Sequence, residues 1–119
     1  MTIRLKGGYD IFMVTIRPVT EVTKSLTDAY KVLIPQLSSS SNPPTEEALQ
    51  RIIESDSAQI LIAEDENGGI LGTMTLIIFQ IPTGIRAWIE DVVVDSSARG
   101  RGIGTVSYTH LTLPTKRIV

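Results

Sequence analysis

The feature that most constrains the fold is an apolar strand followed closely by a glycine-rich loop. Residues Arg86–Val94 end in three consecutive β-branched residues and are typical of a strand. After a short link the chain continues as Arg99-Gly100-Arg101-Gly102-Ile103-Gly104. Glycines let the main chain approach a ligand, N–H groups at a helix start attract anions, and arginines add charge-assisted hydrogen bonds. The pattern predicts a diphosphate-binding loop, and by itself it also fits a tight turn with solvated arginines.

Upstream of this loop the sequence alternates between helical and strand patterns. Apolar residues at helical spacing over residues 20–37 predict a helix. We expect Thr20 to cap its start, and Pro35 to end or kink it near Leu33–Ile34. Thr45 is expected to cap a second helix. Strands are expected over residues 13–18, 59–64, 70–80 and 86–94, and residues 1–12 show no clear pattern.

Turn sequences between these segments indicate how the strands pair. Asp65-Glu66-Asn67-Gly68-Gly69 is a strong turn sequence because Asn-Gly tolerates positive φ, so the strands on either side should form a hairpin. Ile81-Pro82-Thr83-Gly84 marks a second turn. The order strand, helix, helix, strand, strand, strand and glycine-rich loop indicates an α/β (α+β) fold with a mainly antiparallel central sheet.

Composition narrows the classes of function. The 119 residues suit one domain, with an ordinary apolar fraction of 42%. The chain has no cysteine, which excludes disulfides, a thiolate nucleophile and a Cys-ligated metal site, and we predict no metal cofactor. The net charge of -2 argues against a nucleic-acid binder, and no apolar stretch approaches the roughly 20 residues of a membrane span. We therefore expect a cytoplasmic protein without nucleic-acid or membrane partners.

Other phosphate-binding loops fit the sequence less well. The P-loop pattern G-x-x-x-x-G-K-[ST] is absent, and a dinucleotide loop needs a parallel βαβ unit that the antiparallel order does not supply. By contrast, Trp88–Gly104 resembles the strand-and-loop core of the GNAT acetyltransferases, whose loop follows the pattern Arg/Gln-x-x-Gly-x-Gly/Ala. Arg99, Gly102 and Gly104 match that pattern, and the element order from Met13 matches the first part of the GNAT fold.

The resemblance implies an acetyl-CoA-dependent N-acetyltransferase that acts on a primary amine of a small molecule or peptide. It implies that N–H groups of Arg101 to Thr105 bind the pyrophosphate of acetyl-CoA, and that main-chain groups of Val92 and Val94 pair with the pantetheine arm. The full set of expected cofactor-binding residues is Val92, Val93, Val94, Arg99, Gly100, Arg101, Gly102, Ile103, Gly104 and Thr105. The Ile-Glu-Asp-Val-Val-Val run also resembles the amino-sugar-phosphate branch of the family, although the loop departs from that branch's spelling.

Glu90 is the candidate catalytic general base, because GNAT relatives with an Ile-Glu-Asp segment use that glutamate directly or through water. Strand alternation places Glu90 with Val92 on one face and Asp91 with Val93 on the other. Asp91 is therefore expected to be a structural hydrogen-bonding residue. The alternative for Glu90 is a solvent-facing carboxylate or an ion-pair partner of Arg86.

The sequence after Gly104 departs from the GNAT pattern. A helix, a fifth strand, a fourth helix and a general-acid tyrosine are expected there, but residues 106–119 contain Pro114 and no helical apolar stripe. Residues 106–115 resemble the translation of a transposase-type sequencing adapter. We expect three segments: an N-terminal extension over residues 1–12, which is either native or the product of a misplaced start, the N-terminal portion of a GNAT domain over residues 13–105, and an artefactual tail over residues 106–119. An unusual genuine C-terminal strand is the alternative.

This interpretation separates the parent protein from the polypeptide. The parent is expected to be an enzyme, whereas the 119-residue chain is expected to be inactive because it lacks one wall of the cleft and exposes a strand edge. His110, the only histidine, lies in the tail and is not a candidate base. The alternatives are a non-catalytic acyl-CoA-binding or regulatory module on the same scaffold, and a small anion-binding domain without CoA specificity. A homodimer of the full-length parent also remains open.

Overall fold

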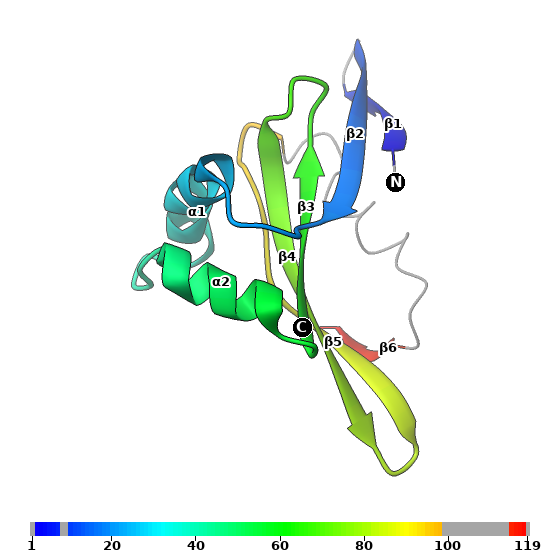
Figure 1. Cartoon of the computed structure of the whole chain (residues 1–119). Helices are drawn as coiled ribbons and strands as arrows, with labels where there is room; N and C mark the ends of the chain where they lie inside the picture. Colours follow the sequence, from blue (N-terminus) through cyan, green and yellow to red (C-terminus); the bar gives the residue numbers. More distant parts are fainter. Residues whose placement is uncertain (1, 8–9, 99–114, 119) are drawn as a thin grey trace.

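The computed structural model describes residues 2–7, 10–98 and 115–118. Its elements are β1 (Thr2–Gly7), β2 (Asp10–Pro18), α1 (Lys24–Leu37), α2 (Glu46–Glu54), β3 (Ala58–Glu64), β4 (Ile70–Ile81), β5 (Gly84–Val94) and β6 (Thr115–Ile118). Both helices lie on one side of the sheet, and the far end of the β4–β5 hairpin projects beyond the body (Figure 1). The predicted α/β fold with a mainly antiparallel sheet is confirmed.

The described strands form one sheet in the order β1 to β6. Neighbouring strands from β1 to β5 are antiparallel, whereas β5 and β6 are parallel. The chain was expected to expose a strand edge, but β6 pairs there with Ala87, Trp88 and Ile89 of β5. This pairing covers part of the β5 edge. The adapter origin of residues 106–119 concerns the DNA rather than the fold and stays a prediction.

The N-terminal residues form strands where no clear pattern was recognised. β1 pairs with β2 along its length, from Gly7 opposite Asp10 to Thr2 opposite Thr15. Met13 is therefore not the start of the structured chain. A signal for β1 was present, because Ile3-Arg4-Leu5-Lys6 alternates apolar and basic residues with the period of a strand.

Threonine caps set the starts of both helices. Thr45 caps α2 as predicted, accepting a hydrogen bond from the N–H of Ala48 at 3.1 Å. Helix α1 begins later than predicted, because its cap is Thr23 rather than Thr20, and Thr23 Oγ1 accepts from the N–H of Leu26 at 3.1 Å. A main-chain hydrogen bond to β3 holds the residue after β2 against the sheet, which delays the turn into the helix.

Pro35 lies inside α1 without ending it. The helix was predicted to end or kink just before this residue, but it continues to Leu37. The N–H of Ser38 then bonds to the carbonyl of Ile34 at 2.8 Å and closes the last turn. Proline has no N–H, so the helix loses one main-chain hydrogen bond at Pro35. Because Pro35 lies in the last turn, few helical residues follow it, and the helix can continue to its end.

The Asp65–Gly69 turn joins β3 and β4 into the predicted hairpin. Asp65 Oδ1 accepts from the N–H groups of Asn67 at 2.9 Å and Gly69 at 2.8 Å. Gly68 has a φ of 81°, which glycine adopts without a steric cost. The side chain of Asp65 therefore substitutes for main-chain partners inside the turn.

Apolar side chains cover both faces of the central strands. On the helix side the buried cluster contains Val19, Leu26, Tyr30, Ile34, Leu49, Ile60 and Ile62. On the opposite side a cluster contains Met74, Leu76, Ala87 and Ile89. A sheet buried on both faces is stabilised mainly by the removal of these side chains from water. In the part of the chain that the structure describes, neither helix is long and apolar enough to cross a membrane.

Candidate functional site

Strand β5 carries a β-bulge within the predicted site. The flanking cross-strand pairs are Glu90 with Thr75 and Val93 with Thr73. Between them Asp91 and Val92 oppose a single residue of β4, so one extra residue is inserted into β5. Asp91 has a φ of 51°, and among the described residues it is the only non-glycine residue with positive φ. Aspartate tolerates this left-handed region better than most residues, yet it is strained there, and such strain often marks a functional position.

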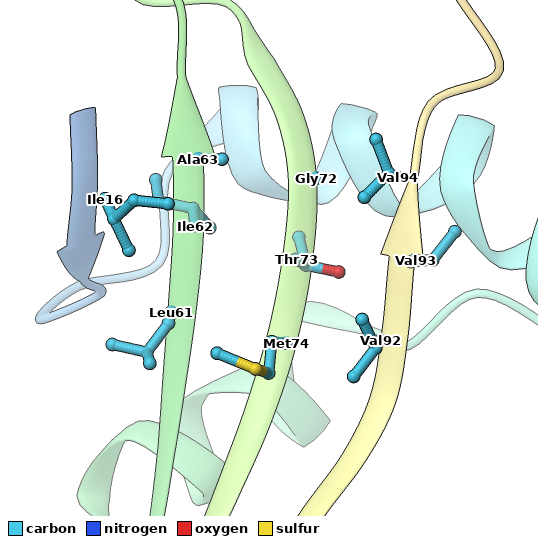
Figure 2. Close-up of a pocket in the computed structure, with 10 residues that line it drawn as sticks. All are labelled: Ile16, Leu61, Ile62, Ala63, Gly72, Thr73, Met74, Val92, Val93 and Val94. Carbon is cyan, nitrogen blue, oxygen red and sulfur yellow. The ribbon is translucent and has the colours of Figure 1, made fainter. Parts of the chain in front are cut away.

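The bulge changes which side chains share a face of β5. Glu90 and Val93 lie on the helix side, because their partners on β4 pair in turn with the helix-facing residues of β3. Val92 and Val94 lie on the opposite side, where Val92 packs against the cluster around Met74 (Figure 2). The predicted alternation, which placed Glu90 with Val92, is therefore wrong. The extra residue shifts the period by one between them.

Glu90 is held by a neighbour on its own strand. The indole Nε1–H of Trp88 donates a hydrogen bond to Glu90 Oε1, and both side chains are half-buried. Arg86 does not pair with Glu90, since its guanidinium donates to the carbonyl of Ile85 and to Thr83 Oγ1. The structure thus orients the Glu90 carboxylate through an uncharged donor, which leaves its charge uncompensated by a cation among the described residues.

A pocket on the helix side of the bulge is the best candidate for an acceptor site. Its volume is about 280 Å³, and its walls come from α1, the α1–α2 link, α2, β4 and β5. Tyr30, Thr75 and Asp91 contribute polar groups to it, whereas Glu90 is not among its lining residues. Asp91 was predicted to be a structural hydrogen-bonding residue, and sequence alternation gave no sign that it lines a pocket. Only the bulge, which the sequence pattern does not reveal, brings it there.

Tyr30 lies in this pocket beside two threonines. Burial raises the pKa of the Tyr30 phenol, the hydroxyls of Thr73 and Thr75 offset part of this rise, and the nearby carboxylate of Asp91 adds to it. The phenol is therefore neutral at physiological pH. Thr73 Oγ1 is buried close to the phenol, but no contact to it among the described residues meets the geometry of a hydrogen bond.

On the opposite face of the bulge, the described residues line a small apolar crevice. Leu61, Met74, Val92 and Val94 are among its walls (Figure 2). Its volume is about 10 Å³, close to the lower limit for one water molecule. This crevice is too small for a substrate, so the helix side is the better candidate for acceptor binding.

The predicted phosphate loop, Arg99–Thr105, lies outside the described residues, but the chain that leads into it is described. The carbonyl of Asp95 accepts from the N–H of Ala98 at 2.8 Å and forms a turn directly after β5. The N–H of Ser96 donates to Gln36 Oε1 of α1 at 2.8 Å. Ala98 is buried, so the described chain is held against the body up to this residue. Within the described residues no group of three or more acidic or histidine side chains could hold a metal ion.

The fold matches several solved acetyltransferases at low sequence identity. An acetyltransferase from Trypanosoma brucei has a TM-score of 0.66 at 21% identity, covering 89% of this chain and 82% of that one. An aminoglycoside acetyltransferase from an uncultured soil metagenomic sample has a TM-score of 0.67 at 19% identity, with coverages of 89% and 76%. Glucosamine-6-phosphate N-acetyltransferase from Arabidopsis thaliana has a TM-score of 0.63 at 24% identity, with coverages of 89% and 81%. At these identities the likeness shows the fold.

The sequence itself matches a family model. The match is to the acetyltransferase (GNAT) family and covers residues 24–112, well over half of the chain. A search of curated protein sequences gives no match. The matched region includes both helices, the bulged strand and the predicted phosphate loop. Family match and fold together show that this chain belongs to the GNAT family of acetyltransferases.

Proposed function

We propose that the GNAT domain to which these residues belong binds acetyl-CoA and transfers its acetyl group to a primary amine of a small molecule or peptide. The bulge at Asp91 and Val92 is the observation that carries this proposal. It places a carboxylate and a pocket on the helix side of β5, while the β5 main chain continues along the sheet edge towards the predicted phosphate loop. Amine and thioester would therefore approach the same stretch of strand from two directions.

The geometry of β5 fits the proposed cofactor site. The described ladder to β6 ends at Ile89, so it does not include Val92. An extended pantetheine arm could add to this edge in the manner of a strand. We propose that the main chain of Val92–Val94 binds the pantetheine and that residues Arg99–Thr105 bind the pyrophosphate. The turn from Asp95 to Ala98 delivers the chain from one segment to the other.

Glu90 is proposed as the general base. Acetyl-CoA, when bound, supplies a thioester carbonyl and a thiol leaving group. An acceptor that enters as an ammonium ion first gives one proton to Glu90, which frees its lone pair. The amine then attacks the carbonyl, the C–N bond forms as the C–S bond breaks, and the second proton that the nitrogen loses passes to the leaving CoA thiolate. Because Glu90 does not line the acceptor pocket, a water molecule is the expected bridge. The Trp88 N–H holds the carboxylate in one orientation.

Calorimetry with CoA and with inorganic pyrophosphate tests the cofactor assignment on the 119-residue chain. We expect CoA to bind more tightly, because pantetheine adds main-chain hydrogen bonds that pyrophosphate lacks. Equal binding, or none, would refute an acetyl-CoA site. Transfer is then measured with protein in excess over acetyl-CoA, so that a slow single turnover suffices. Binding of CoA without transfer to any amine would favour the non-catalytic acyl-CoA-binding module. A cytoplasmic location and homodimerisation stay part of the proposal.

A further inference from the structure

The pocket beside the bulge has apolar walls on its helix side. Ile34 and Leu37 come from α1, and Leu49 and Ile52 from α2. Its volume of about 280 Å³ lies just below the roughly 300–1,000 Å³ of typical small-molecule sites. The shape and lining therefore suit a compact ligand body that is mainly apolar.

Polar groups gather on the remaining walls of this pocket. Ser41 and Asn42 come from the α1–α2 link, and Thr75 comes from β4. Asp91 is the only charged residue among the described residues that line the pocket. Asp91 is exposed, its main chain is left-handed, and no ion pair to it is present among the described residues. From the described residues, the pocket thus receives one negative charge and no lysine or arginine.

We propose that this pocket selects a primary ammonium ion carried on a compact, uncharged and largely apolar body, such as an arylalkylamine. The assignment rests on the proposed function, since it names the acceptor for that same site. Asp91 pairs with the ammonium group, and the aliphatic side chains of α1 and α2 cover the body. Asp91 is thus a binding group, whereas Glu90 takes the proton that the ammonium ion must lose before it attacks.

The same charges disfavour an anionic acceptor. A sugar phosphate would bring its phosphate into a pocket whose single charged group is a carboxylate, with no cation on the described walls to pair with it. Phosphate recognition normally relies on arginine or lysine. The amino-sugar-phosphate resemblance of the Ile-Glu-Asp-Val-Val-Val run therefore does not extend to this pocket.

Calorimetry on the 119-residue chain at pH 7 tests the assignment with three probes: 2-phenylethylamine, its uncharged analogue 2-phenylethanol, and glucosamine 6-phosphate. We expect the amine to bind most tightly. Asp91→Asn keeps a residue that tolerates the left-handed region and should weaken the amine about threefold to tenfold while leaving 2-phenylethanol unchanged. Asp28→Asn is the matched control, because Asp28 is exposed on α1 outside the pocket. Circular dichroism verifies that both variants remain folded.

The assignment would be overturned by equal amine affinity in the Asp91→Asn variant and the unaltered chain, or by tighter binding of glucosamine 6-phosphate than of the amine. Failure of 2-phenylethylamine to bind at all has the same meaning. CoA binding measured on the same samples separates this failure from that of the proposed function. Where CoA binds normally, only the acceptor class falls, whereas a loss of CoA binding in the unaltered chain removes the acetyl-CoA site itself.

Discussion

Replacing Asp91 tests whether the bulge requires a left-handed residue. With a φ of 51°, an L-residue at this position carries a cost of about 1–2 kcal/mol, which the short polar side chain of aspartate reduces. A β-branched residue has no such relief, and we expect Asp91→Val to lower the free energy of unfolding by about 2 kcal/mol. Asp91→Gly removes the strain but loses more chain entropy on folding, so the two effects, each about 0.5–1 kcal/mol, should nearly cancel.

Gln80→Val provides the matched control for the same type of substitution. Gln80 is exposed on β4 and pairs in register with Ile85, and its φ is not positive. Valine favours strands, so the change should stay within about 0.5 kcal/mol of the unaltered chain. Replacing a polar residue by valine is therefore expected to lower the free energy of unfolding at the bulge but not in the regular part of the β4–β5 ladder.

Urea unfolding followed by circular dichroism measures these differences by linear extrapolation. For Asp91→Val we expect a fall in Tm of about 8 °C, at roughly 4 °C per kcal/mol for a chain of this size. If Asp91→Val and Gln80→Val have the same free energy of unfolding, the bulge does not require a residue that tolerates the left-handed region. This result would mean that β5 forms without the left-handed residue, and that the placement of Glu90 and Asp91 on the helix side does not depend on it.

Three further predictions follow from buried or oriented polar groups. Thr73→Val should raise the free energy of unfolding by about 1 kcal/mol, because it removes a buried hydroxyl without a hydrogen-bond partner among the described residues. Thr27→Val should lower that free energy by a similar amount, because Thr27 Oγ1 donates to the carbonyl of Lys24 at 3.0 Å. Urea unfolding measures both changes, and changes of the same sign would contradict this expectation. The raised pKa of Tyr30 means that the folded state keeps the phenol proton to higher pH than the unfolded state does, so the free energy of unfolding should fall as pH rises above about 10. Tm measured against pH should show this decline, and Tyr30→Phe should make it shallower. Glu90→Gln should lower the single-turnover rate by a larger factor than it weakens acetyl-CoA binding, which calorimetry measures; an unaltered rate across pH would remove Glu90 from the role of base.

Local signals in the sequence predicted the elements whose residues interact with near neighbours. The cap at Thr45 and the turn over Asp65–Gly69 each depend on bonds between residues at most four apart, and both were predicted correctly. The cap of α1 was misplaced because Thr20 and Thr23 are chemically equivalent. The choice between them depends on the bond of Val19 to β3, a contact between distant segments that no local pattern contains.

The arrangement of the candidate site depended on a tertiary feature that local patterns hide. Glu90 was singled out as the candidate base, a role that stays a prediction, but the side chains that share its face of β5 were predicted wrongly. A bulge is defined by two strands together, so the alternation of β5 alone could not show that Asp91 is the inserted residue. Consequently the sequence located the strand that carries the site, while the pocket and the placement of Asp91 in it emerged only from the pairing with β4.

The hydrogen bond from Trp88 to Glu90 provides an internal optical probe. Trp88 is the only tryptophan in the chain, so all indole emission originates beside the proposed base. A change of charge on the carboxylate alters the electric field at the indole, and the emission wavelength should follow it. Glu90→Gln should therefore shift the emission while retaining the fluorescence, because it removes the negative charge and keeps an acceptor for the indole N–H. No label or coupled enzyme is needed, so changes around the proposed base become observable even where acetyl transfer is slow.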